Sequence, residues 1–139
     1  MNPPTVLIVD DNAALREMLL QVFALCGFKA LAAADATAAL RLTDTIVFGA
    51  ALVDLELPGM KGIELCRALR TRSDRPPLVW VMTGGDDERI KAEALSAGAV
   101  EVWRKPFPAF ELCARIRRRL AGGGCDPTDG TDPLFFSAA

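Results

Sequence analysis

Short apolar runs alternate along the chain with stretches in which apolar residues recur at helical spacing. The runs 6–9 and 50–53 are apolar throughout and do not alternate with polar residues. Such runs are typical of parallel strands that are buried on both faces. After the first run, apolar residues fall on one face of a helix that ends near Gly27: Leu15, Met18, Leu19, Val22 and Phe23.

The same pattern continues to give five strand and helix units. Strands are predicted at residues 5–9, 29–34, 50–53, 78–82 and 100–103, and the later helices at residues 36–44, 59–70, 86–97 and 108–121. This alternation predicts an α/β fold, in which helices cover both faces of a parallel sheet. Ligands of such folds bind outside the carboxyl ends of the strands, where the strand order reverses.

Three carboxylates stand at two of these strand ends. Asp10 and Asp11 follow the first buried run, and Asp54 follows the third. If both runs are buried parallel strands, their ends bring the three acids together at one edge of the sheet, where the acids repel one another. A hard divalent cation relieves that repulsion, and an all-oxygen site suits Mg²⁺ or Mn²⁺.

Composition restricts the class of protein. A chain of 139 residues with 51% hydrophobic content suffices for one domain with its own core. The 16 basic and 18 acidic residues give a net charge of −2 without a long block of one sign, so nothing indicates binding to nucleic acid or membranes. The first apolar run lacks a preceding basic region and ends at Asp10, so we expect a cytoplasmic protein without a secretory signal.

Histidine is absent, which excludes a histidine base, a histidine-ligated metal and a phosphohistidine carrier. The four cysteines, at positions 26, 66, 113 and 125, form no Cys-x-x-Cys pair, so neither a zinc site nor a redox motif is predicted. The first three fall on predicted helices and are expected to be small core residues.

The composition changes abruptly after Leu120, where three glycines precede a segment rich in Asp, Pro, Thr and Gly. We therefore predict a folded domain at residues 1–121 and a flexible tail at residues 122–139. The apolar residues 134–136 are expected to be disordered or packed locally, although docking on the domain or on a partner is an alternative.

Two more residues with suitable chemistry follow strands. Thr83 follows the fourth strand and Lys105 the fifth. A carboxylate can attack phosphorus when a divalent ion and an ammonium group neutralise the phosphoryl oxygens, and a hydroxyl can hold a remaining oxygen. Asp54 stands alone at the central strand end and is the best candidate nucleophile, whereas Asp10 and Asp11 suit metal binding.

Each residue alone has a simpler interpretation. Asp10 and Asp11 can cap the first helix together with Asn12, and Asp54 can be a turn residue. Thr83 can be a loop hydroxyl and Lys105 a solvated surface charge. Four strand ends that carry such residues at once favour the combined site.

With these residues the sequence resembles the receiver domain of two-component response regulators. The matching segments cover 5–121 and include Val6–Asn12, Val53–Gly62, Met82–Gly84 and Gly98–Phe107. The resemblance implies a flavodoxin-like, doubly wound sheet of five strands in the order 2-1-3-4-5, with five helices.

The resemblance also implies that Asp54 accepts a phosphoryl group from a histidine kinase or a phosphotransfer protein. Mg²⁺ would be held by Asp10, Asp11, Asp54 and the backbone carbonyl of Glu56, while Thr83 and Lys105 would contact the phosphoryl oxygens. The bond between Lys105 and Pro106 would be cis, as it is in relatives.

The chain departs from the family at a residue that takes part in the conformational change on phosphorylation. Relatives place an aromatic residue three positions before the lysine, where this chain has Val102, so the output step is expected to differ or to be weaker. Trp103 should point to the opposite face and pack there. Gly84 and Gly85 should make the loop after Thr83 compliant, or simply form a turn before Asp86, a candidate helix cap. Glu56 is a candidate for influencing the lifetime of the phosphorylated form.

The last predicted helix carries four arginines. Arg115, Arg117, Arg118 and Arg119 would complement the helix dipole, which is the favoured interpretation. Alternatively, they could pair with Asp86, Asp87 and Glu88 of a second copy, across the face of helix 4, strand 5 and helix 5 that relatives use to dimerise.

The sequence thus favours a stand-alone receiver that phosphorylation switches and whose output is a contact with a target protein. It is not expected to be an enzyme beyond phosphorylating and dephosphorylating its own Asp54. The alternative is an interaction protein of the same fold that works without phosphorylation. A phosphatase of the haloacid dehalogenase type is disfavoured because Asp10-Asp11-Asn12 lacks the Asp-x-Asp pattern, and a transcription factor because the segment after Ala121 is too short for a DNA-binding domain, unless the chain is a fragment.

Overall fold

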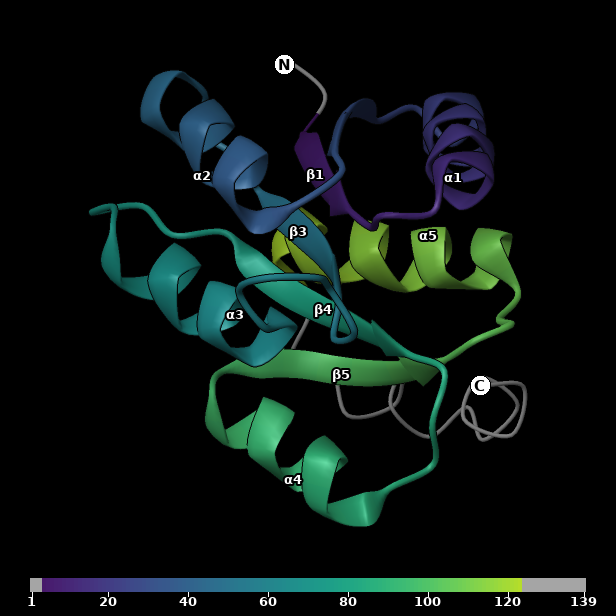
Figure 1. The fold of residues 1–139 in the computed structure, drawn as a ribbon. Helices are drawn as coiled ribbons and strands as arrows, with labels where there is room; N and C mark the ends of the chain where they lie inside the picture. Colours follow the sequence, from purple (N-terminus) through teal and green to yellow (C-terminus); the bar gives the residue numbers. More distant parts are fainter. Residues whose placement is uncertain (1–3, 124–139) are drawn as a thin grey trace.

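The computed structural model describes residues 4–123 and contains five strands and five α-helices there (Figure 1). The strands are β1 (Thr5–Val9), β2 (Lys29–Ala33), β3 (Ala50–Asp54), β4 (Leu78–Thr83) and β5 (Ala99–Arg104). The helices are α1 (Ala13–Leu25), α2 (Ala36–Thr45), α3 (Gly62–Thr71), α4 (Glu88–Ser96) and α5 (Ala109–Arg118), and a π-helical turn follows at Arg119–Gly123.

All strand pairs are parallel, and their order is β2-β1-β3-β4-β5. The predicted doubly wound α/β fold is therefore confirmed. The order reverses at β1 and β3, so the carboxyl ends of these two strands flank the switch point at which such folds bind ligands.

The sheet separates two apolar layers. Alternate residues of β1 face opposite sides: Val6 and Ile8 join a cluster with residues of α1 and α5, whereas Leu7 and Val9 join one with residues of α2, α3 and α4. Figure 1 shows α1 and α5 together on one face and α2, α3 and α4 on the other. Burial on both faces explains why the central strands read as continuous apolar runs.

Two helices begin two or three residues later than the sequence pattern predicted. α3 begins at Gly62 and not at Gly59, because Gly59 has φ +78°, a left-handed conformation that cannot continue into a helix. α4 begins at Glu88 with Asp87 as its cap, since the Asp87 side chain accepts a hydrogen bond of 2.8 Å from the amide of Arg89. The prediction that Asp86 caps this helix was wrong; its carboxylate instead pairs with Lys91 and Arg104.

Gly62 lets α3 approach the end of β3 very closely. A Cβ atom at this position would lie 2.4 Å from the carbonyl oxygen of Asp54 and 2.5 Å from the Cα of Leu55. Only a residue without a side chain fits there, so Gly62 helps to fix the backbone that carries Asp54.

No helix within residues 4–123 is long and apolar enough to cross a bilayer. Of the tail predicted at residues 122–139, residues 124–139, which include Cys125 and the apolar segment 134–136, lie outside the described residues.

Candidate functional site

Asp10 lies directly after β1, and none of its surface is exposed. Its Oδ1 atom accepts a hydrogen bond of 2.8 Å from the amide of Asn12. Asn12, not Asp10 or Asp11, caps α1, because its side chain accepts a hydrogen bond of 3.0 Å from the amide of Leu15. The interpretation of the two acids as helix caps is therefore wrong, whereas the capping role of Asn12 is confirmed.

Asp54 is the last residue of β3 and is 2% exposed. Its Oδ1 atom accepts a hydrogen bond of 2.9 Å from the amide of Glu56, two residues along the chain. Burial raises the pKa of the Asp54 carboxyl, the hydrogen bond from Glu56 opposes that rise, and the neighbouring charge of Asp10 adds to it. A cation bound beside Asp54 would therefore stabilise its charged form.

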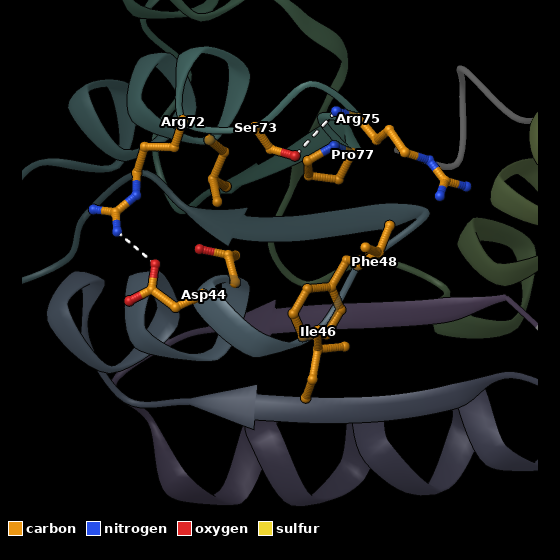
Figure 2. Close-up of a pocket in the computed structure, with 10 residues that line it drawn as sticks. Asp44, Ile46, Phe48, Arg72, Ser73, Arg75 and Pro77 are labelled. Carbon is orange, nitrogen blue, oxygen red and sulfur yellow. Dashed lines mark hydrogen bonds and ion pairs between the residues drawn. The ribbon is translucent and has the colours of Figure 1, made fainter.

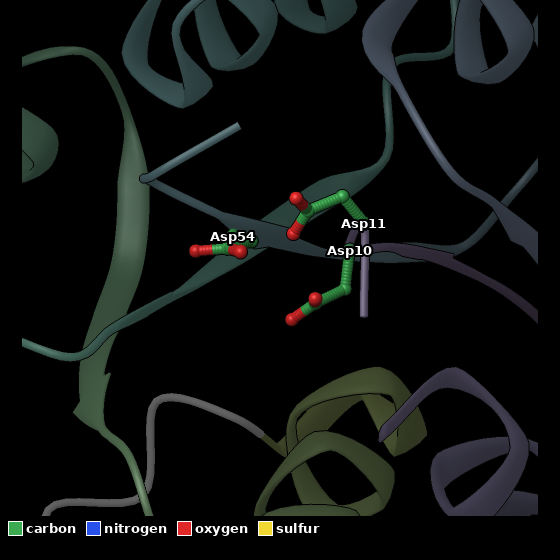
Figure 3. Close-up of side chains that lie close together, drawn as sticks. All are labelled: Asp10, Asp11 and Asp54. Carbon is green, nitrogen blue, oxygen red and sulfur yellow. The ribbon is translucent and has the colours of Figure 1, made fainter. Parts of the chain in front are cut away.

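Asp10, Asp11 and Asp54 come together as the sequence predicted (Figure 3). One carboxylate oxygen of each lies within 4.8 Å of the others, with Asp10 and Asp54 buried and Asp11 exposed. A set of oxygen donors with one solvent-facing member fits Mg²⁺, which retains several water molecules when it binds to proteins.

Lys105 follows β5 and is held beside the acids by a backbone hydrogen bond of 2.7 Å to the carbonyl oxygen of Thr83. Its Nζ atom lies 2.8 Å from Oδ2 of Asp10 and 3.2 Å from Oδ2 of Asp54. Burial by itself would lower the pKa of Lys105, but its contacts with Asp10 and Asp54 outweigh that effect and raise the pKa. The ammonium group therefore stays charged. The Lys105–Pro106 peptide bond is cis, which confirms that expectation.

Thr83 ends β4 and is buried, and its hydroxyl faces a partner that the sequence did not identify. The Oγ1 atom donates a hydrogen bond of 2.6 Å to Oε2 of Glu56 and accepts one of 3.1 Å from the amide of Gly85. Oε1 of Glu56 accepts a further hydrogen bond of 3.0 Å from the amide of Gly84. The Glu56 side chain thus binds the loop after β4.

The described residues contain a second polar centre, on β4, β5 and α5, which the sequence analysis missed. Glu101 accepts hydrogen bonds from the indole nitrogens of Trp80, at 3.0 Å, and Trp103, at 3.3 Å, and forms an ion pair with Arg115. Trp103 is buried in the cluster with α1 and α5, which confirms its predicted packing role, whereas Val102 packs on the opposite face. The only sequence signal for this centre was that the two strands together contain two tryptophans and a single glutamate.

A shallow hollow of about 400 Å³, part of it open solvent, lies before the amino ends of β3 and β4 (Figure 2). Arg72 and Asp44 pair at its rim at 2.7 Å, and both are exposed. Ile46, Phe48 and Pro77 supply apolar lining. This hollow lies at the opposite end of the strands from Asp54, and Asp44 and Arg72 of its lining pair with each other.

The model of the response regulator receiver domain family matches residues 6–117. Among curated proteins, the chain is 40% identical over 133 residues to the sensory transduction protein RegX3 of Mycobacterium tuberculosis, covering 96% of this chain and 58% of RegX3. It is 38% identical over 124 residues to the DNA-binding response regulator MtrA of the same organism, covering 89% of this chain and 54% of MtrA. The chain spans little more than half the length of these relatives.

Solved structures show the same likeness. A receiver domain of response regulator 1452 from Francisella has a TM-score of 0.79 at 27% identity, covering 86% of this chain and 98% of that one. A CheY-like receiver domain protein from Methanospirillum hungatei also has a TM-score of 0.79, at 29% identity, covering 87% of this chain and 96% of that one.

Proposed function

Because this chain belongs to the family of response regulator receiver domains, we propose that Asp54 accepts a phosphoryl group and that the modified form switches a contact with another protein. The observation that carries the proposal is the position of Asp54. Its buried carboxylate lies 3.2 Å from the Lys105 ammonium and shares the sheet edge with two further carboxylates.

The chemistry is an in-line displacement at phosphorus. A carboxylate oxygen of Asp54 forms the new P–O bond while the bond from phosphorus to the donor group, the imidazole nitrogen of a phosphohistidine or the acyl oxygen of a small phosphodonor, breaks. The amide of Glu56 orients Asp54 through Oδ1. Lys105 neutralises the phosphoryl oxygens, and Thr83 holds one of them through its hydroxyl.

The donor set favours Mg²⁺, with Mn²⁺ as an alternative, held by the carboxylates of Asp10, Asp11 and Asp54 and the backbone carbonyl of Glu56. When bound, this ion supplies charge neutralisation between the entering phosphoryl group and the acids.

A histidine kinase or a histidine phosphotransfer protein is the proposed donor, and a target protein in the cytoplasm the proposed recipient of the signal. We propose that the receiver itself makes no contact with nucleic acid, whatever the output of the longer relatives. An alternative partner is a second copy of this chain, bound through the face of α4, β5 and α5. In the described residues Asp86 and Glu88 pair with Lys91 of the same chain.

A second candidate function is a receiver-fold interaction protein that works without phosphorylation. The observation that favours it is Val102, a half-buried aliphatic residue at the position where relatives turn an aromatic ring. Intact mass spectrometry after incubation with a small phosphodonor and Mg²⁺ separates the two, since only the first function requires an adduct on Asp54. Autophosphorylation and autodephosphorylation at Asp54 are the only catalytic steps proposed.

A further inference from the structure

The side chain of Glu56 forms a bridge between the end of β3 and the loop that follows β4. Its two oxygens accept hydrogen bonds from different groups: Oε2 from the Thr83 hydroxyl at 2.6 Å, and Oε1 from the Gly84 amide at 3.0 Å. A carboxylate with two such donors is held in one orientation, and the loop is held with it.

The Thr83 hydroxyl has a single proton, which it uses to donate its hydrogen bond to Glu56. The amide of Gly85 donates to Oγ1 at 3.1 Å, so this contact uses an acceptor position of the hydroxyl and leaves its proton directed at Glu56. Thr83 therefore cannot donate to a phosphoryl oxygen on Asp54 until its bond to Glu56 breaks.

Glu56 carries a charge of the same sign as the group that Thr83 is proposed to bind. Within residues 4–123 the nearby cation, Lys105, pairs with Asp10 and Asp54 and not with Glu56. Glu56 is itself exposed, so its side chain can turn to solvent once its donors are taken. Gly84 and Gly85 would have no side-chain contact closer than 3.7 Å even if each carried a Cβ, so the loop has room to move.

We propose that Glu56 is a latch: its carboxylate occupies the donors of Thr83 and Gly84 in the unphosphorylated protein, and a phosphoryl group on Asp54 must replace it as the acceptor of the Thr83 hydroxyl. This inference rests on the proposed function, because it takes Thr83 as a ligand of the phosphoryl group. Glu56 acts here as a positioning residue, separate from the role proposed for its backbone carbonyl.

The first experiment examines the latch without any phosphoryl group. Amide hydrogen exchange of Gly84 and Gly85 is measured in the wild type, in Glu56→Ala, and in Glu93→Ala, which removes an exposed glutamate from α4. Loss of a charged hydrogen bond should raise the exchange rate of Gly84 about tenfold in Glu56→Ala. Exchange in Glu93→Ala should match the wild type. An unchanged rate at Gly84 in Glu56→Ala overturns the latch.

The second experiment measures the affinity for BeF₃⁻, which stands in for a phosphoryl group on a carboxylate, at saturating Mg²⁺. Glu56→Ala should bind it about tenfold more tightly than the wild type, because no bond to Thr83 has to be broken. Glu56→Gln, which keeps an oxygen acceptor but no charge, should lie between the two. An affinity equal to or weaker than that of the wild type in Glu56→Ala overturns the proposal.

A double-mutant cycle separates the latch from simple charge repulsion. In a Thr83→Ala background, removal of Glu56 should change BeF₃⁻ affinity far less than in the wild type, since the competing donor is gone. If removal of Glu56 raises BeF₃⁻ affinity by the same factor in both backgrounds, charge repulsion alone explains the gain and the latch is overturned. If the wild type fails to bind BeF₃⁻ while Gly84 exchange still responds to Glu56→Ala, the proposed function fails and the contact between Glu56 and the loop stands.

Discussion

The ammonium group of Lys105 lies 2.8 Å from the Oδ2 atom of Asp10, a carboxylate with no exposed surface. The same ammonium group reaches Asp54 at 3.2 Å. Lys105 therefore neutralises the two buried acids in the metal-free protein and occupies oxygens that a divalent cation needs. Cation binding and the ion pairs of Lys105 are in competition.

Replacing Lys105 by Met should consequently tighten Mg²⁺ binding while it weakens phosphoryl transfer. Loss of the competing positive charge should increase Mg²⁺ affinity by about tenfold or more, because a unit charge about 4 Å away contributes about 1 kcal/mol even at the dielectric constant of water and Mg²⁺ carries two charges. Calorimetric titration measures the affinity, and the rate of adduct formation with acetyl phosphate measures the transfer. Weaker Mg²⁺ binding in the variant contradicts the competition.

Asp54→Asn should stabilise the metal-free protein. The substitution removes a desolvated charge that also repels Asp10, while Lys105 keeps its partner in Asp10. We expect an increase of about 1 kcal/mol in the free energy of unfolding, measured by urea denaturation without Mg²⁺. Mg²⁺ should then stabilise the wild type more than the variant, because binding to the native state adds stability only where the site is intact. Equal stabilisation of both proteins by Mg²⁺ places the ion elsewhere.

Mg²⁺ affinity should fall as the solution is acidified. The fall should begin at a higher pH than it would if Asp54 had the ordinary pKa of an aspartate. The pKa of Asp54 is raised above 3.8, mainly by burial, so the native protein holds this proton more tightly than the unfolded chain. The unfolding free energy of the metal-free protein therefore decreases as pH rises from about 3.8 through the raised pKa. Tryptophan fluorescence titrations with Mg²⁺ at several pH values measure the effect, and pH-independent affinity above pH 4 contradicts it.

Gly62→Ala should destabilise the protein and disturb Asp54. A Cβ atom there would meet backbone atoms of Asp54 and Leu55, which cannot move without shifting β3. Such overpacking costs about 1–3 kcal/mol, measurable by urea denaturation. Gly49→Ala is a suitable control because its nearest contact would be 3.7 Å away. Equal stabilities of the two variants argue against a required close approach at Gly62.

Glu101→Gln should destabilise the link between the sheet and α5. The change removes the carboxylate that pairs with Arg115 and weakens the acceptor shared by Trp80 and Trp103. We expect a loss of about 1–3 kcal/mol and a change in tryptophan emission, since both indole nitrogens donate to this carboxylate. Glu93→Gln, on an exposed part of α4, should change neither. If Glu101→Gln is as stable as the wild type, Glu101 does not contribute to the stability of the link between the sheet and α5.

The strands, the helices and the acidic cluster followed from the sequence because they depend on local pattern, whereas the strand order was inferred from the resemblance to receiver domains. Buried runs such as 6–9 and 50–53 identify parallel strands, and a residue at the end of such a strand has a predictable place. Asp10, Asp11 and Asp54 could therefore be brought together without coordinates.

Contacts that depend on side-chain orientation between distant segments were not predictable. Glu56 and Thr83 are 27 positions apart, and an exposed glutamate in a turn gives no signal of the loop it binds. From the sequence, Glu101 is expected on the solvent-facing side of a strand, although in the structure it accepts a hydrogen bond from Trp80 and pairs with Arg115. The delayed start of α3 depends on the left-handed backbone of Gly59, which the apolar pattern does not record.

The role of Asp54 is tested most directly by intact mass spectrometry after incubation with acetyl phosphate. The experiment compares the wild type, with and without Mg²⁺, with Asp54→Asn. We expect a single phosphoryl adduct on the wild type that requires Mg²⁺ and is absent from Asp54→Asn. An adduct of equal yield on Asp54→Asn, or none on a wild type that demonstrably binds Mg²⁺ and is mixed with an active phosphodonor, would contradict Asp54 as the phosphoryl acceptor.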